Sequence, residues 1–171
     1  RTAKELGMSR REIRAIRRAA LLHDVGKLAV SSSILDKPSA LDPDEMTEMR
    51  SHTGYTYQIL SRVTRFQRFA PLAASHHERL DGTGYHLGLD GDELGLPARV
   101  LAVADVCEAL SSDRPYRKGM QLEGVLARLE EQVAAGHLCP VATEALAGWF
   151  IGMGGSTNEH SVVDDSTSLV A

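Results

Sequence analysis

The sequence has 171 residues, 43% of them hydrophobic and 25% charged, which is typical of a globular protein and sufficient for one domain with a hydrophobic core. Only 5% of the residues are aromatic, while alanine and leucine are abundant, which favours helices over a β-sandwich. The net charge of −4 argues against binding to a nucleic-acid polymer, and no apolar run approaches the roughly 18 residues of a transmembrane helix.

Two helices are predicted in the first 25 residues. Residues 1–6 resemble the last turns of a helix that Gly7 ends. Ser9 and Glu12 form a capping-box pattern, so a second helix should begin there and end near Val25, with Gly26 as its terminator. Its apolar face would consist of Ile13, Ile16, Ala20 and Leu21, together with Ala19 and Leu22. We interpret its arginines as a solvated face: Arg10, Arg11, Arg14, Arg17 and Arg18.

The remaining chain also predicts helices. After a connector at 29–41, Asp42 and Pro43 favour a helix start, and this helix should run to about Ser61. Further helices are expected over 65–78, 97–111, 121–135 and 140–151, with a glycine-rich loop over 80–96. The prediction is an all-α, single-domain helical bundle over residues 1–151, followed by a flexible tail over 152–171.

Several potential metal ligands lie in these helices. They are His23, Asp24, His52, His76, His77 and Asp105. Imidazole and carboxylate groups suit first-row transition metals. Structural zinc sites usually include cysteine, and Cys107 and Cys139 lack the spacing of such a site. The set therefore favours a reaction centre, and the two distant cysteines indicate a reducing, cytoplasmic location.

Taken singly, each of these residues has a simpler interpretation. Asp105 lies in an apolar helix, where either a cation or a buried arginine or lysine must offset its burial. His76 and His77 would point about 100° apart on a regular helix and could serve one site only if the helix loosens. His52 could be an ordinary core histidine. Lys27 could either present its ammonium to a phosphate or cap the end of a helix.

The order of the motifs resembles a known family. Residues 22–28, LHDVGKL, resemble the signature of the HD superfamily of metal-dependent phosphohydrolases. Residues 76–85, HHERLDGTGY, resemble the second signature of the HD-GYP family, bacterial signalling enzymes that hydrolyse cyclic di-GMP. Further matches follow at 35–38, 51–54, 103–106 and 112–117.

This resemblance implies a specific site. It implies an HD-type helical domain around a multinuclear centre of two or three divalent metal ions, iron or manganese, with Asp24 bridging two of them. The implied metal ligands are His23, Asp24, His52, His76, His77 and Asp105. The implied substrate-binding residues are Lys27, Gly84, Tyr85, Arg114 and Arg117. The implied reaction converts cyclic di-GMP to linear pGpG, and further to GMP, by attack of a metal-bridging hydroxide, with Asp24 and Lys27 as the catalytic residues.

The chain also departs from the family pattern. His86 replaces the proline of the GYP motif, which frees a backbone φ angle, and we expect a surface histidine there. The family's additional upstream histidine ligand would precede Arg1, so we interpret the chain as part of a longer protein with a sensor or receiver domain upstream. Cys139 replaces an aspartate before Pro140, which should affect only capping. Two other functions stay open: a non-catalytic module that binds a cyclic dinucleotide or a partner protein, and an HD phosphohydrolase for another nucleotide.

Overall fold

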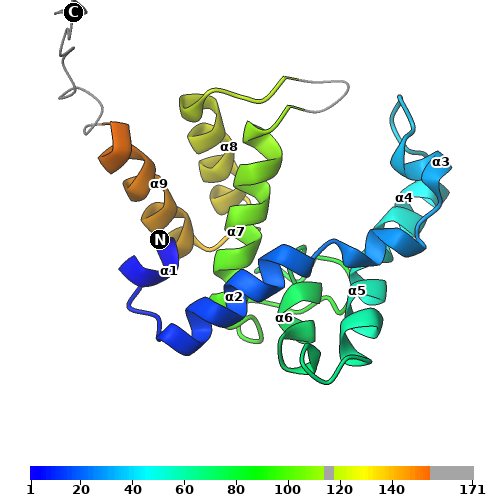
Figure 1. Cartoon of the computed structure of the whole chain (residues 1–171). Coiled ribbons are helices and arrows are strands. Elements are labelled where there is room, and N and C mark those ends of the chain that lie inside the picture. The colour runs from blue at the N-terminus through cyan, green and yellow to red at the C-terminus, as the bar shows by residue number, and fades with distance from the viewer. Residues whose placement is uncertain (114–117, 155–171) are drawn as a thin grey trace, which may run out of the picture.

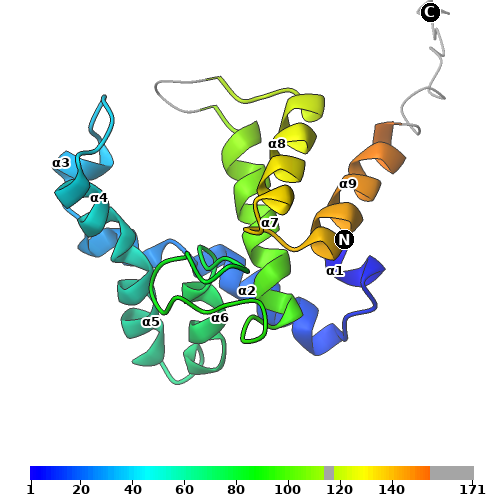
Figure 2. The same cartoon turned by 180° about the vertical axis from the view of Figure 1, so that it is seen from behind.

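The computed structural model describes residues 1–113 and 118–154, and Figures 1 and 2 show it from opposite sides. In chain order, its elements are α1 (Thr2–Glu5), α2 (Arg10–Leu22), the 3-10 helix η1 (Val25–Ala29), α3 (Ser32–Leu35), α4 (Pro43–Arg50), α5 (His52–Ser61), the 3-10 helix η2 (Gln67–Phe69), α6 (Ala70–Ala74), α7 (Leu96–Ser111), α8 (Leu122–Ala134) and α9 (Pro140–Gly154). The β-structure of the described residues is one isolated bridge between Asp81 and Asp90. The predicted all-α fold is confirmed. None of the helices in this described part is both long and apolar enough to cross a lipid bilayer.

Two hydrophobic cores hold the helices together. The first joins α7, α8, α9 and α1 around residues such as Val103, Leu129 and Ala142. The second joins α2, α5, η2 and α6 around Phe69, and α7 contributes Leu101 to it. In Figure 1, α2 crosses beneath α7, while α3 and α4 form an arm that stands away from both cores. Because α7 contributes side chains to both cores, it links the two groups of helices.

The start of α2 is as predicted, but its buried face differs. The Glu12 amide donates to Ser9 Oγ at 3.2 Å, and the Ser9 amide donates to Glu12 Oε2 at 2.8 Å, which completes the capping box. The predicted apolar face was wrong at two positions, because Ala20 is exposed and the side chain of Leu21 is 83% exposed. The helix instead packs through residues three apart, which are Ile13, Ile16, Ala19 and Leu22.

Several helix ends also differ from the prediction. The helix expected over 42–61 begins at Pro43, capped by Asp42, but is divided at Ser51, whose hydroxyl donates to the Glu48 carbonyl at 2.6 Å. The helix expected over 65–78 is shortened to η2 and α6, which end at Ala74. The expected connector at 29–41 contains the short helix α3. At the C-terminal end, α9 continues to Gly154, past the predicted tail boundary at 152, and residues 155–171 lie outside the described part.

The predicted role of Gly26 was also wrong. Gly7 follows α1 with the expected left-handed backbone, φ +67°, but Gly26 has no positive φ and lies within η1. Its role is close approach, because a Cβ at this position would lie 1.9 Å from the His52 carbonyl oxygen and 2.5 Å from the Thr56 amide nitrogen. The Gly26 amide donates to Thr56 Oγ1 at 3.0 Å, and that hydroxyl donates to the His23 carbonyl at 2.7 Å. The backbone of η1 therefore lies directly on α5.

This contact predicts opposite effects of alanine at two glycines. Gly26→Ala should destabilise the protein by about 3 kcal/mol or more, because the methyl group would overlap backbone atoms that cannot rotate away. Gly148→Ala, at an exposed position of α9 with no heavy atom within 4 Å of the added methyl, should stabilise the protein by about 0.5–1 kcal/mol. Urea unfolding followed by circular dichroism measures both. Equal small effects would contradict the proposed contact.

Candidate functional site

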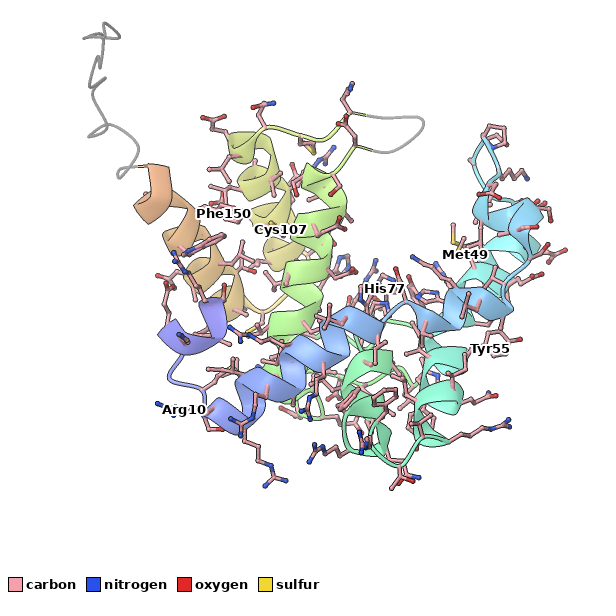
Figure 3. All side chains as sticks on the ribbon, in the orientation of Figure 1. Arg10, Met49, Tyr55, His77, Cys107 and Phe150 are labelled. Atoms are coloured by element: carbon pink, nitrogen blue, oxygen red, sulfur yellow. The ribbon has the colours of Figure 1, made fainter. Side chains whose placement is uncertain are left out.

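The six predicted metal ligands lie together in the structure. His23 and Asp24 follow α2, His52 is the first residue of α5, and Asp105 is on α7. In Figure 3, His77 is labelled between α7 and the end of α2. His23 Nε2 lies 3.3 Å from Asp105 Oδ1, and His77 Nδ1 lies 3.6 Å from Asp105 Oδ2. Among the described residues, the ion-pair partners of Asp105 are therefore histidines, and no arginine or lysine of residues 1–113 and 118–154 pairs with it.

Asp24 lies at the centre of this group. Its Oδ1 is 3.4 Å from His52 Nε2 and 3.7 Å from His76 Nε2. Its Oδ2 is 3.4 Å from His23 Nε2 and 2.5 Å from Lys27 Nζ. The two oxygens therefore face different sets of neighbours, which is the position that a carboxylate bridging two cations would occupy.

Three of the histidines are oriented in the same way. The Nδ1 atoms of His23, His52 and His76 each face the backbone carbonyl three residues earlier, at 2.8, 2.7 and 2.7 Å. A ring nitrogen that donates to a carbonyl carries the proton, so in the neutral ring Nε2 is left with its lone pair. All three Nε2 atoms face Asp24. The backbone thus selects the tautomer that can bind a metal ion.

The early end of α6 explains how neighbouring histidines serve one site. Because the regular helix ends at Ala74, residues 75–77 form a turn. The rings of His76 and His77 lie 4.1 Å apart by their centroids, and both rings lie 5.3 Å from the ring of His52. A regular helix through residue 78 would have directed one of the two rings elsewhere.

The electrostatics of the site differ among its members. The carboxylates of Asp105 and Asp24 raise the pKa of His23 to about 10. Burial lowers the pKa values of His52, His76 and His77, so these rings are neutral near pH 7. Burial alone would raise the pKa of Asp24, but hydrogen bonds from His23 and Lys27 outweigh it and hold this pKa well below its usual range. Asp24 is therefore ionised.

The donor set fits divalent cations. Two groups of three side chains, each with ligand atoms within 4.8 Å of one another, share His76: His52, His76 and His77, and His23, Asp24 and His76. Asp24 Oδ1 is buried and has no hydrogen-bond partner among the described residues. An unpaired buried carboxylate oxygen costs free energy that a cation would offset. Nitrogen and oxygen donors without cysteine suit iron, manganese or a similar metal.

A cavity with a volume of about 660 Å³ lies beside these residues. This volume is within the roughly 300–1,000 Å³ that is usual for small-molecule sites. It is lined by His23, Asp24, Lys27, Met49, His52, His77, Tyr85, Asp105, Glu108, Ala109, Ser112 and Asp113.

The Tyr85 ring lies 4.7 Å from the His77 ring, and burial raises the pKa of Tyr85 to about 12, so the phenol keeps its proton. The Arg50 guanidinium lies 5.4 Å from the centre of the Tyr85 ring. Arg114 and Arg117 lie outside the described residues.

The loop that carries Tyr85 is held by Glu78, a residue whose role the sequence did not indicate. Glu78 is only 2% exposed, and its two carboxylate oxygens accept hydrogen bonds from the amides of Leu87 at 2.7 Å and Leu89 at 3.1 Å. A Cβ on Gly84 would lie 2.5 Å from Glu78 Cα. The glycine of the GY motif is therefore required where the loop passes over the Glu78 backbone.

His86 takes a backbone conformation that the motif proline cannot adopt. Its φ is +106°, whereas proline is fixed near −65°. Its side chain is exposed, as expected, and its ring lies 6.0 Å from that of Tyr57. A Cβ on Gly54 would approach the His86 ring to 3.2 Å. The substitution thus changes the shape of the loop one residue after Tyr85.

Comparison with known proteins places this site in a family. Residues 1–140 match a family model described as HD domain. The chain is 47% identical over 131 residues to the 3'3'-cGAMP-specific phosphodiesterase 3 of Vibrio cholerae, covering 77% of this chain and 28% of that protein. It is 47% identical over 132 residues to the cyclic di-GMP phosphodiesterase response regulator RpfG of Xanthomonas campestris, covering 76% of this chain and 35% of that protein. The chain therefore spans about a third of the length of these relatives.

A solved structure shares the fold. The chain aligns with an HDG"Y"P protein from Bdellovibrio bacteriovorus with a TM-score of 0.69 at 18% identity, covering 88% of this chain and 48% of that one. The chain belongs to the HD domain family.

The raised pKa of His23 predicts that metal binding is coupled to proton release. Near pH 7 the metal-free site carries a proton on His23, whose pKa is about 10, and a cation bound at Nε2 must displace it. Binding of Mn²⁺ should release about one proton, and the apparent affinity should rise about tenfold per pH unit until the pH reaches this pKa. Calorimetry in two buffers of different ionisation enthalpy measures the released protons. Binding without proton release would contradict the expectation.

The buried position of Glu78 predicts a stability effect. Glu78→Gln leaves one acceptor oxygen for two part-buried amides and should cost about 1–3 kcal/mol. The amides of Leu87 and Leu89 should then exchange faster with solvent. Glu93→Gln serves as the control, because Glu93 is an exposed residue of the same loop whose carboxylate accepts from the Asp90 amide at 3.3 Å. Chemical denaturation and amide exchange measure both variants, and equal losses would contradict the role of Glu78.

Proposed function

We propose that the protein is a metal-dependent phosphodiesterase that hydrolyses a cyclic dinucleotide. The main observation in support is the buried Asp24 Oδ1, which has no hydrogen-bond partner among the described residues and lies near the rings of His52 and His76, at the edge of a cavity that Lys27 also lines. The names of the relatives point to the same substrate class, since one is a 3'3'-cGAMP phosphodiesterase and another a cyclic di-GMP phosphodiesterase. The HD-GYP motifs favour cyclic di-GMP as the substrate, with linear pGpG as the first product and GMP after a second cleavage.

The proposed ligands of the metal ions are Asp24 and the five side chains gathered around it. They are His23, Asp24, His52, His76, His77 and Asp105. Bound divalent cations supply a water nucleophile that is active near neutral pH and neutralise the charge of a phosphodiester. Asp24 contributes an ionised carboxylate at every pH at which such an enzyme would work, because its pKa is far below neutrality.

Lys27 is positioned to contact the substrate phosphate. Its ammonium is held by Asp24 Oδ2 at 2.5 Å, and its side chain is 36% exposed on the wall of the cavity. A fixed positive charge beside a phosphate oxygen stabilises the charge that develops during hydrolysis. Tyr85 presents a protonated phenol as a hydrogen-bond donor on the same cavity, with Arg50 beside its ring. Arg114 and Arg117 stay predicted phosphate contacts.

Two substitutions test the proposal. Asp24→Asn should abolish metal uptake and hydrolysis together, whereas Lys27→Met should keep the metal and lower turnover by about 10²-fold, as expected for loss of one preplaced charge. Asp92→Asn and Lys4→Met are controls of matched charge on exposed positions away from the cavity lining. Elemental analysis measures the metal and chromatography of the products measures turnover. Unchanged turnover in Asp24→Asn would overturn the proposal.

Hydrolysis of several cyclic dinucleotides by one preparation of the protein distinguishes the candidate substrates. Cyclic di-GMP should be cleaved faster than 3'3'-cGAMP and cyclic di-AMP. Preference for 3'3'-cGAMP would assign the specificity of the Vibrio cholerae relative instead. Metal-loaded protein that binds these dinucleotides without cleaving any of them would be a non-catalytic module.

A further inference from the structure

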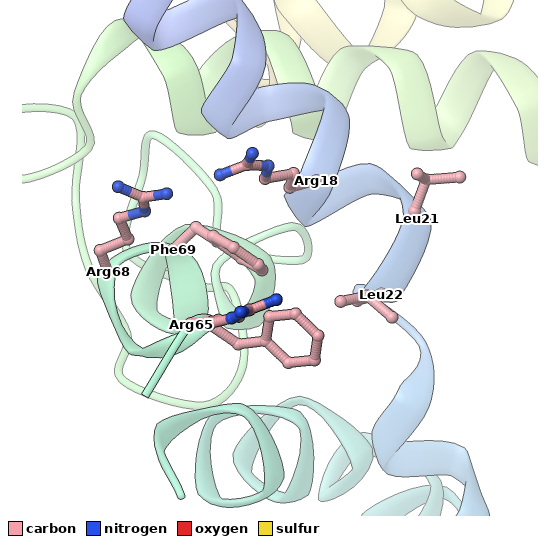
Figure 4. Close-up of a pocket in the computed structure, with 7 residues that line it drawn as sticks. Arg18, Leu21, Leu22, Arg65, Arg68 and Phe69 are labelled. Carbon is pink, nitrogen blue, oxygen red and sulfur yellow. The ribbon is translucent and has the colours of Figure 1, made fainter. Parts of the chain in front are cut away.

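A second pocket lies between the C-terminal end of α2 and residues 65–69. It has a volume of about 550 Å³ and is lined by Arg18, Leu21, Leu22, Arg65, Phe66, Arg68 and Phe69. Figure 4 shows Arg18 and Arg68 with their guanidinium groups turned toward each other above Phe69, and Leu22 on the wall that α2 forms. None of these seven residues lines the cavity beside Asp24.

The rim of this pocket is positively charged. Arg18, Arg65 and Arg68 have no ion pair or side-chain hydrogen bond to any residue within 1–113 and 118–154. The surrounding segments strengthen the field, because residues 10–22 contain five arginines and one glutamate and residues 62–69 contain three arginines and no acid. The chain as a whole has a net charge of −4, so these two segments are basic against the overall charge balance. Several unpaired guanidinium groups around one concavity favour an anion with several oxygens, and arginine pairs bidentately with phosphate.

The floor and wall of the pocket are apolar. The rings of Phe66 and Phe69 lie 5.5 Å apart at 43°, and Phe69, at 2% exposure, is packed in the second core. Leu21 is 83% exposed beside it, and the predicted packing of this leucine into the core does not occur. An exposed leucine and the half-buried ring of Phe66 beside arginines favour a ligand with a planar apolar part.

We propose that this pocket binds a nucleoside phosphate, with the base against Phe66, Leu21 and Leu22 and the phosphate among Arg18, Arg65 and Arg68. The two halves of the pocket match the two halves of such a ligand, and aromatic stacking together with guanidinium pairing is how proteins hold nucleotides without a metal. A volume of about 550 Å³ corresponds to a single small molecule, within the roughly 300–1,000 Å³ of ligand sites. The site is separate from the proposed hydrolytic site and does not depend on hydrolysis.

The test compares variants of equal charge. GMP, guanosine and inorganic phosphate are titrated calorimetrically into the 171-residue protein. GMP should bind at least about tenfold more tightly than guanosine or phosphate alone, because each of these lacks half of the contacts. Arg65→Ala/Arg68→Ala should weaken GMP binding at least about tenfold, since two phosphate partners are lost. The control Arg17→Ala/Arg62→Ala removes the same charge outside the pocket and should leave the affinity within about twofold.

A second pair of variants keeps the test independent of the arginines. Leu21→Glu places a carboxylate beside the pocket at an exposed position and should weaken GMP binding, whereas Ile151→Glu, at a position 66% exposed on α9, should not. Methyl resonances of Leu21 and Leu22 should shift on GMP addition in the parent protein. Equal losses in the pocket and control variants would show non-specific charge attraction. Phosphate binding as tight as GMP binding would show an adventitious anion only. Either result overturns the proposal.

Discussion

The packing of the η1 backbone directly on α5 is the constraint on which the site depends. Gly26 has no side chain to separate the two segments, and Thr56 joins them through hydrogen bonds to the Gly26 amide and the His23 carbonyl. This contact fixes the position of Asp24 relative to His52, whose Nε2 atom lies 3.4 Å from the Asp24 carboxylate. A larger residue at position 26 would move the candidate ligand Asp24 away from the candidate ligand His52 by about the width of a methyl group. The charged cluster is therefore built on a neutral contact between two stretches of backbone.

Helix ends supply the second organising principle. His23 follows the last residue of α2, His52 is the first residue of α5, and His76 follows α6, so each lies where the helical hydrogen-bond pattern leaves main-chain groups available. Each ring uses the carbonyl three residues earlier to fix its orientation. The same backbone that ends a helix thus acts as the supporting partner of a ligand. No additional acidic side chain is needed to orient these three rings.

The sequence predicts features that depend on neighbouring residues and misses those that depend on distant contacts. The starts at Ser9 and Asp42 follow from caps within three residues, and the structure has both. The expected ends near Val25 and residue 78 were wrong, because α2 ends at Leu22 and α6 at Ala74, and no cap or glycine at these positions marks either end in the sequence. Leu21 and Leu22 fit the helical period equally well, and only the position of the second core decides which is buried. The six candidate ligands could be named from motifs, whereas Thr56 and Glu78 gain their roles only from groups 30 and 9 residues away.

The packing of α7 in both hydrophobic cores has a mechanical consequence. His23, Asp24 and His52 are fixed to one another through η1 and α5, but Asp105 belongs to a helix that is also embedded in the core of α8 and α9. A tilt of α7 together with that second group of helices would change the 3.3 Å separation between His23 and Asp105. The distance of Asp105 from His23 and Asp24 is therefore set by how α7 packs in both cores, so a rearrangement of α8 and α9 would be transmitted to the histidine and aspartate cluster through α7.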